Sequence, residues 1–285
     1  GPFAPLLHAI ARDPAMLVWL DGNANRKRHP NENFAREVME LFALGRGAYT
    51  EHDIQEAARA FSGWQLHDGQ FWLNTSQHDP GVKTIFGRSG NFNGSDVIDL
   101  CLAQPACARF LADRLVRTFV APSVFGVVLN EIAEDLQRNQ LNLLQSLRTI
   151  CASEEFYGDD LRGSLIKSPV ELVLGTLRPF TTGIRWPAVR QVLNDLGQSV
   201  FAPPSVKGWD GGRQWVHAMG WIQRWNFLTA VTSSGQYARW QSPTPHTASD
   251  WQSAMFSTPL DDATCTALAN AGDQWPALAF ALPEY

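Results

Sequence analysis

The sequence has 285 residues, enough for one large domain or two smaller ones with a substantial core. Apolar residues make up 45% and charged residues 18%, which excludes a disordered chain or a coiled coil. No apolar run is long enough to cross a membrane, so we do not expect a membrane-spanning protein. The net charge of -5 argues against a protein that binds nucleic acid through phosphate contacts.

Hydrophobic periodicity predicts helices along the first part of the chain. Two short helices share residues 4–20, and a polar loop at 21–30 leads to a helix over 31–44 that ends at a glycine. Thr50 is the expected N-cap of the helix over 51–61, because an aspartate follows three residues later.

The pattern changes over residues 62–94. Asp68-Gly69 stands between two short apolar runs, which is the sequence signal of a β-hairpin near 64–73. Four glycines then follow between residues 74 and 95, which indicates an ordered loop region with a short strand at 84–86.

Helical periodicity returns at Ser95 and continues toward the end of the chain. A further helix is predicted after Ser95 and a second segment opens at Pro105; residues 123–152 are expected to form two more helices. Later helices are predicted over 169–180, 187–196 and 215–234, with a loop at 241–250 and two short helices at the end. The sequence therefore predicts a mainly α fold: one multi-helical globular domain over 1–285, with one small β-hairpin insertion at about 62–94.

The four cysteines match no zinc or redox motif, because no two of them are separated by only two residues. Cys101 and Cys107 flank Gln104-Pro105, an expected break between helices, so they could form a disulfide. The alternative is that they are isolated buried thiols.

The helix predicted over 31–44 carries the most informative polar pattern. Asn33, Glu37 and Glu40 fall at positions i, i+4 and i+7, on one ridge of a regular helix. Arg36 lies four residues before Glu40. Two carboxylates one turn apart can hold a divalent metal, or can divide the roles of general acid and base. The alternative is a solvated helix face with ion pairs.

A second group of polar residues lies in the loop after the predicted hairpin. His78, Asp79 and Lys83 occur within six residues, next to Pro80 and Gly81. His78 could be a metal ligand or a general base, and Lys83 could hold an anion. The alternative is a surface loop with local aspartate turn bonds.

Tryptophan is unusually frequent, with 11 Trp against 4 Tyr. Trp209 lies in a glycine-rich turn, Trp215 follows it, and Trp221 and Trp225 are about one helical turn apart. Such residues could stack on a ring-shaped ligand, or could pack in a helical core.

These segments together resemble a known bacterial family of unknown function, numbered 1800. The resemblance runs through DPAMLVWLDG (13–22), PNENFAREVMELFALGRGAYTEHDIQEAARAFSGW (30–64), HDPGVKTIFG (78–87), KSPVELV (167–173), LGQ (196–198) and KGWDGGRQW (207–215). It implies an exported protein, periplasmic or extracellular, often encoded beside a sulfatase-like family of unknown function numbered 1501. Members usually begin with a part that carries a Trp-His-x-x-His-Phe-like segment, so the resemblance implies that this sequence is the C-terminal portion of a longer family domain.

The family has no agreed activity, so two hypotheses stand. The first is a hydrolase or lyase that acts on a cell-envelope or polysaccharide substrate, with a divalent metal as a possible cofactor. Its expected catalytic residues are Glu37, Glu40, His78 and Asp79, and its expected substrate-binding residues are Asn33, Arg36, Lys83, Trp209 and Trp215. For this site we expect the 31–44 ridge to point toward the 78–84 loop. The second hypothesis is a non-catalytic extracytoplasmic binding or assembly module, whose Trp-rich face holds a glycan, an envelope ligand or a sulfatase-like partner.

Overall fold

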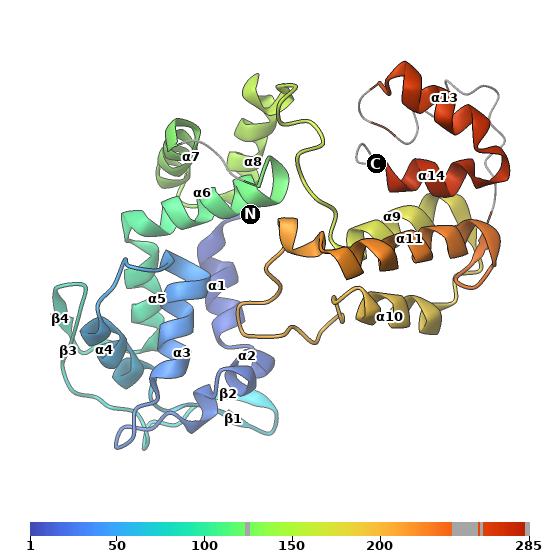
Figure 1. Ribbon diagram of the computed structural model, residues 1–285. Helices are drawn as coiled ribbons and strands as arrows, with labels where there is room; N and C mark the ends of the chain where they lie inside the picture. Colours follow the sequence, from blue (N-terminus) through green and yellow to red (C-terminus); the bar gives the residue numbers. More distant parts are fainter. Residues whose placement is uncertain (123–125, 241–255, 257–258, 283–285) are drawn as a thin grey trace. The chain divides into compact units, whose positions relative to one another are not determined.

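The computed structural model describes residues 1–122, 126–240, 256 and 259–282 (Figure 1). The mainly α fold predicted from the sequence is confirmed. The chain groups into two compact units, Gly1–Phe156 and Tyr157–Tyr285. A single domain over 1–285 stays a prediction, and the predicted loop at 241–250 lies outside the described residues. Among those residues, no helix has both the length and the apolar character needed to cross a membrane.

The first unit consists of helices with two inserted hairpins. Its helices are α1 (Phe3–Ala11), α2 (Pro14–Trp19), η1 (Gly22–Ala24), α3 (Glu32–Glu37), η2 (Val38–Leu44), α4 (Glu51–Phe61), α5 (Gly94–Leu102), α6 (Pro105–Phe119), α7 (Gly126–Arg138) and α8 (Leu143–Ala152), and the short η3 (Glu155–Tyr157) crosses its end. Its strands are β1 (Trp64–His67), β2 (Gln70–Leu73), β3 (Lys83–Ile85) and β4 (Arg88–Gly90).

The helix predicted over 31–44 is not a regular α-helix. Asn31 caps it, accepting a hydrogen bond from the Asn33 backbone N–H at 2.9 Å. After Glu37 the chain continues as the π-helix η2, and the Gly45 N–H donates to the Glu40 carbonyl five residues earlier, at 3.1 Å. Gly45 ends the helix in the left-handed region, with φ of 76°. Hydrophobic periodicity does not reveal this change of pitch, and π-helical turns occur frequently at functional sites.

Helix α4 packs against α3, β3 and α5 in the first unit. The predicted cap is present: Thr50 and Asp53 form a capping box. The C-terminal end of α4 packs in a cluster of aromatic side chains. The centroid of the Phe61 ring lies 5.0 Å from that of Phe34 and 5.1 Å from that of Trp64. Gly94 begins α5 against these rings. A Cβ added there would lie 2.5 Å from Phe61, so only glycine fits.

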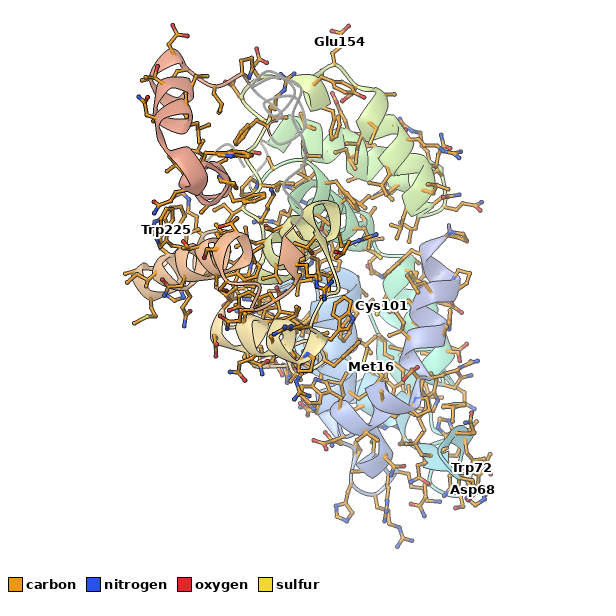
Figure 2. All side chains as sticks on the ribbon, turned by 90° about the vertical axis from the view of Figure 1, so that its right-hand side faces the viewer. Met16, Asp68, Trp72, Cys101, Glu154 and Trp225 are labelled. Carbon is orange, nitrogen blue, oxygen red and sulfur yellow. The ribbon has the colours of Figure 1, made fainter. Side chains whose placement is uncertain are left out.

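The hairpin predicted at Asp68-Gly69 is confirmed. Strands β1 and β2 pair antiparallel, and both turn residues have positive φ, 49° and 73°. Figure 2 shows Asp68 and Trp72 together at this tip. Strands β3 and β4 form a second hairpin, where the sequence predicted only a short strand. Its turn places Phe86 at φ 50°, and the Asp53 carboxylate accepts the Phe86 N–H at 2.7 Å.

The second unit is also helical. Its elements are α9 (Pro169–Phe180), β5 (Thr181–Thr182), α10 (Trp186–Asp195), η4 (Gly212–Trp215), α11 (Ala218–Ser233), β6 (Arg239–Trp240), α13 (Asp262–Asn270), η5 (Gly272–Gln274) and α14 (Trp275–Ala281). Strands β5 and β6 make a two-residue antiparallel pair. The core lies where α9, α10 and α11 meet, and it includes Leu177, Val189 and Phe227.

Cys101 and Cys107 do not form a disulfide. Both are buried free thiols, which agrees with the alternative reading of their spacing. Burial raises the pKa of Cys107 to about 12 and that of Cys101 further still, so neither side chain is a reactive thiolate at neutral pH.

Candidate functional site

Asn33 and Arg36, two expected substrate-binding residues, both have partners within the fold. The Asn33 side-chain amide donates to the Leu20 carbonyl at 3.1 Å. The Arg36 guanidinium donates to both carboxylate oxygens of Glu51, at 2.9 and 2.7 Å, and to Glu32 at 3.0 Å. These contacts tie α3 to the chain before it and to the first turn of α4.

Glu40 lies on the π-helix and accepts two hydrogen bonds. Arg46 Nε donates to one carboxylate oxygen at 2.6 Å, and the Tyr49 hydroxyl donates to the other at 2.8 Å. These bonds hold the pKa of Glu40 below its ordinary value, with Arg46 the larger cause. Burial and the Glu40 bond raise the pKa of Tyr49 to about 12. Glu40 is therefore ionised at neutral pH.

Glu37 has the opposite surroundings. Its carboxylate is partly buried, and within the described residues it makes no hydrogen bond and no ion pair. Burial is the main cause that raises the pKa of Glu37, and the negative charge of Glu40 adds to it, against weaker opposition from Arg36 and Arg46. The short segment that contains both residues therefore carries an ionised carboxylate with two hydrogen-bond donors, Glu40, and a carboxylate with no donor among the described residues, Glu37.

The loop at 78–84 is a network anchored on α4. His78 Nδ1 lies 2.9 Å from the Ser62 carbonyl oxygen. A carbonyl only accepts, so Nδ1 is the donor of this bond, and Nε2 is the ring nitrogen that faces away from Ser62. Asp79 accepts from Arg59 Nε at 2.8 Å, and this bond is the main cause that lowers the pKa of Asp79. Ser62 Oγ accepts the Asp79 backbone N–H at 2.8 Å.

Lys83 is fully buried at the end of this loop. Its ammonium donates to the Asp79 backbone carbonyl at 2.5 Å, and burial lowers the pKa of Lys83. Glu56 accepts from Arg59 at 2.8 Å and from the Thr84 N–H at 2.8 Å, which holds strand β3 on α4. An ammonium buried in this way supports the loop internally.

The two polar groups contact α4 through different residues. The α3 group reaches it through Glu51, and the loop reaches it through Glu56 and Arg59. Around a regular helix, residue 51 lies roughly 140° from residue 56 and roughly 80° from residue 59. Within the described residues, no hydrogen bond or ion pair joins Glu37 or Glu40 to His78, Asp79 or Lys83.

The four tryptophans singled out in the sequence of the second unit fall into two sets. Trp209 and Trp215 are partly buried beside the glycine-rich turn, which Lys207 and Asp210 close with an ion pair. Trp221 and Trp225 lie on α11 and are 49% and 42% exposed, so they are not core residues. Trp225 is labelled in Figure 2.

Two of the family segments have a structural explanation at the start of α9. Ser168 and Glu171 form a capping box, and the Gln198 side chain accepts the Val170 N–H at 2.9 Å. The segments KSPVELV and LGQ therefore meet at one helix end, whose donors are satisfied within the fold.

Four side chains that were not predicted from the sequence define the surroundings of the predicted site: Arg46 and Tyr49 at Glu40, and Glu56 and Arg59 at the loop. All four lie inside the segment over 30–64. Arg46 and Tyr49 follow a helix-ending glycine, and the turn that brings them back to Glu40 is not readable from helical spacing.

The side chains around the predicted site give little support for a metal centre. Across the described ranges, no group of three or more His, Cys, Asp or Glu side chains is placed to hold a metal ion. Glu37 and Glu40 supply two carboxylates without a third protein ligand.

Comparison with known proteins identifies the family of this chain but gives no activity, substrate or partner. Neither the curated proteins nor the solved structures include a match to this chain. The family model described as "Protein of unknown function (DUF1800)" matches residues 1–285. The chain therefore belongs to the DUF1800 family.

Proposed function

We propose that this protein is an exported hydrolase or lyase that acts on a cell-envelope or polysaccharide substrate, with Glu37 as its general acid or base. The observation that carries the proposal is the contrast between Glu37 and Glu40. A pair of carboxyl groups whose surroundings shift their pKa values apart is an arrangement that acid–base enzymes use.

Glu37 has the properties needed to move a proton. A raised pKa brings a carboxyl group closer to neutral pH, where it can both donate and accept. In a hydrolase, the protonated form would give its proton to the leaving oxygen of the substrate. In a lyase, the ionised form would take a proton from the carbon next to the bond that breaks.

Glu40 would keep the neighbouring charge fixed. Arg46 and Tyr49 hold it ionised, so its charge favours the protonated form of Glu37 and would stabilise positive charge that develops on a bound substrate. His78 and Asp79 complete the proposed site, the first through Nε2, the ring nitrogen that does not face the Ser62 carbonyl, and the second by orienting the loop. Arg36, Asn33 and Lys83 support these elements.

Product release from cell-envelope material tests the proposal. Purified peptidoglycan and acidic exopolysaccharide are incubated with the protein, and new reducing ends and unsaturated products are measured. We expect release by the parent and by the exposed control Glu154→Gln, and a loss of about 100-fold or more in Glu37→Gln. Equal release by Glu37→Gln, or none by the parent, would overturn the proposal.

Exposed tryptophans of the second unit support the second hypothesis, a binding module. Trp186, Trp221 and Trp225 are 60%, 49% and 42% exposed, and exposed indole rings are typical of surfaces that bind sugars or partner proteins. Under this alternative, the same polysaccharides would quench tryptophan fluorescence without product release, and Glu37→Gln would bind as the parent does.

A further inference from the structure

Arg224 is a buried arginine in the second unit with incomplete hydrogen bonding. It lies on α11, is 8% exposed, and donates from Nη2 to the Lys167 carbonyl at 2.8 Å. A guanidinium has five N–H donors. Its Nε is buried, and no acceptor for it exists in the described part of the chain.

Arg224 also lacks an acidic partner among the described residues. Burial alone lowers the pKa of Arg224, and no carboxylate opposes that shift. Glu171, one turn into α9, is engaged with the Ser168 N–H at 2.7 Å. Buried charges in proteins are normally paired, because desolvation of an isolated ion is costly.

We propose that Arg224 anchors a binding site for an oxyanion, a carboxylate or phosphate group of a small ligand. An oxyanion oxygen at Nε would supply the missing acceptor, and the charge of the oxyanion would supply the missing partner for the guanidinium. Trp221 lies three residues before Arg224, on a neighbouring position of the same helix face, and is 49% exposed. Its ring can cover an apolar or cyclic body attached to the anion. This site is separate from the proposed function and does not depend on Glu37.

Titration with inorganic phosphate and with acetate tests the site, with sodium chloride keeping the ionic strength constant. The arginine Nε–H signals are followed by ¹⁵N NMR on the unaltered chain. We expect one signal, absent from the spectrum of Arg224→Lys, to shift and saturate. Saturation by phosphate alone assigns a phosphoryl ligand, by acetate alone a carboxylate ligand, and by both a general oxyanion site.

Thermal unfolding supplies the second measurement. Phosphate or acetate should raise the Tm of the parent and of Arg190→Met, an exposed arginine on α10, but not that of Arg224→Met. Methionine fills a similar volume without charge, so we expect Arg224→Met to fold with unchanged or higher stability. Absence of a saturating Nε shift up to about 100 mM of either anion, enough to fill a site with a Kd of about 10 mM, would overturn the proposal. An equal Tm increase in all three proteins would overturn it as well.

Discussion

Glu37 and Glu40 lie three residues apart on one helical segment, and their surroundings shift the pKa of their carboxyl groups in opposite directions. Glu40 has two hydrogen-bond donors, whereas Glu37 has none within the described residues and lies partly buried beside the charge of Glu40. A carboxylate used only for stability would be placed with a donor, so this arrangement favours a role in chemistry.

Glu37→Gln should not destabilise the protein at neutral pH. The pKa of Glu37 is higher in the folded state than in the unfolded state, so the folded state binds this proton more tightly. The free energy of unfolding therefore decreases as pH rises from about 4.5 through the raised pKa and Glu37 becomes charged. Denaturant unfolding at pH 4 and pH 7 checks this: the variant should equal the parent at pH 4 and match or exceed it at pH 7. A loss at pH 7, absent from Glu154→Gln, would show that Glu37 is held by a partner.

Tyr49→Phe should destabilise the protein and raise the pKa of Glu40. The hydroxyl makes a charge-assisted hydrogen bond, so we expect a loss of about 1.5–3 kcal/mol at pH 7. Because the pKa of Glu40 is lowered, this stabilisation is present above the ordinary glutamate pKa and disappears as pH falls through the lowered value. In the Glu40→Gln background the same substitution should cost much less. Equal cost in both backgrounds would contradict the assignment.

Asp79→Asn should loosen the loop at 78–84. The substitution removes the charge that pairs with Arg59, at an expected cost of about 2 kcal/mol. Asp68→Asn is the matched control, because Asp68 is 90% exposed in its side chain and asparagine tolerates its left-handed backbone. The cost should vanish as pH falls through the lowered pKa of Asp79. If unfolding gives the same free energy for both variants at pH 7, the network is not holding the loop.

Gly63→Ala should be far more harmful than Gly69→Ala. Both glycines have positive φ, 81° and 73°, so both substitutions incur a backbone cost of about 1 kcal/mol. A Cβ at Gly63 would also lie 2.5 Å from the Asn74 carbonyl and 2.9 Å from the His78 N–H, whereas at Gly69 it meets nothing within 4 Å. We expect a total loss of at least about 3 kcal/mol for Gly63→Ala. Similar unfolding free energies would show that residues 74–78 yield to the extra methyl group.

The elements set by local chemistry were predictable from the sequence. Thr50 and Ser168 cap helices as their spacing indicates, and Asp68-Gly69 makes its hairpin turn. The hairpin at Phe86 was not predictable, because a phenylalanine at positive φ depends on the Asp53 carboxylate, which comes from α4.

For the candidate site, residue types were predictable and their partners were not. Spacing placed Glu37 and Glu40 on one ridge, but the π-helical pitch after Glu37 and the return of Arg46 and Tyr49 decide which carboxylate is satisfied. The joint site of this ridge with His78 stays a prediction. Arg224 had no sequence signal, because a buried unpaired donor is visible only once α11 is packed.

Direct titration of Glu37 tests whether its surroundings and those of Glu40 shift the two pKa values apart. Side-chain carboxyl ¹³C NMR of the ¹³C-glutamate-labelled chain, with Glu37→Gln and Glu40→Gln for assignment, gives both pKa values in one experiment. We expect the pKa of Glu37 to lie above the ordinary 4.5 and that of Glu40 to lie below it, and we expect Glu40→Gln to lower the pKa of Glu37. A pKa of Glu37 at or below 4.5, or one that does not respond to Glu40→Gln, would contradict this expectation.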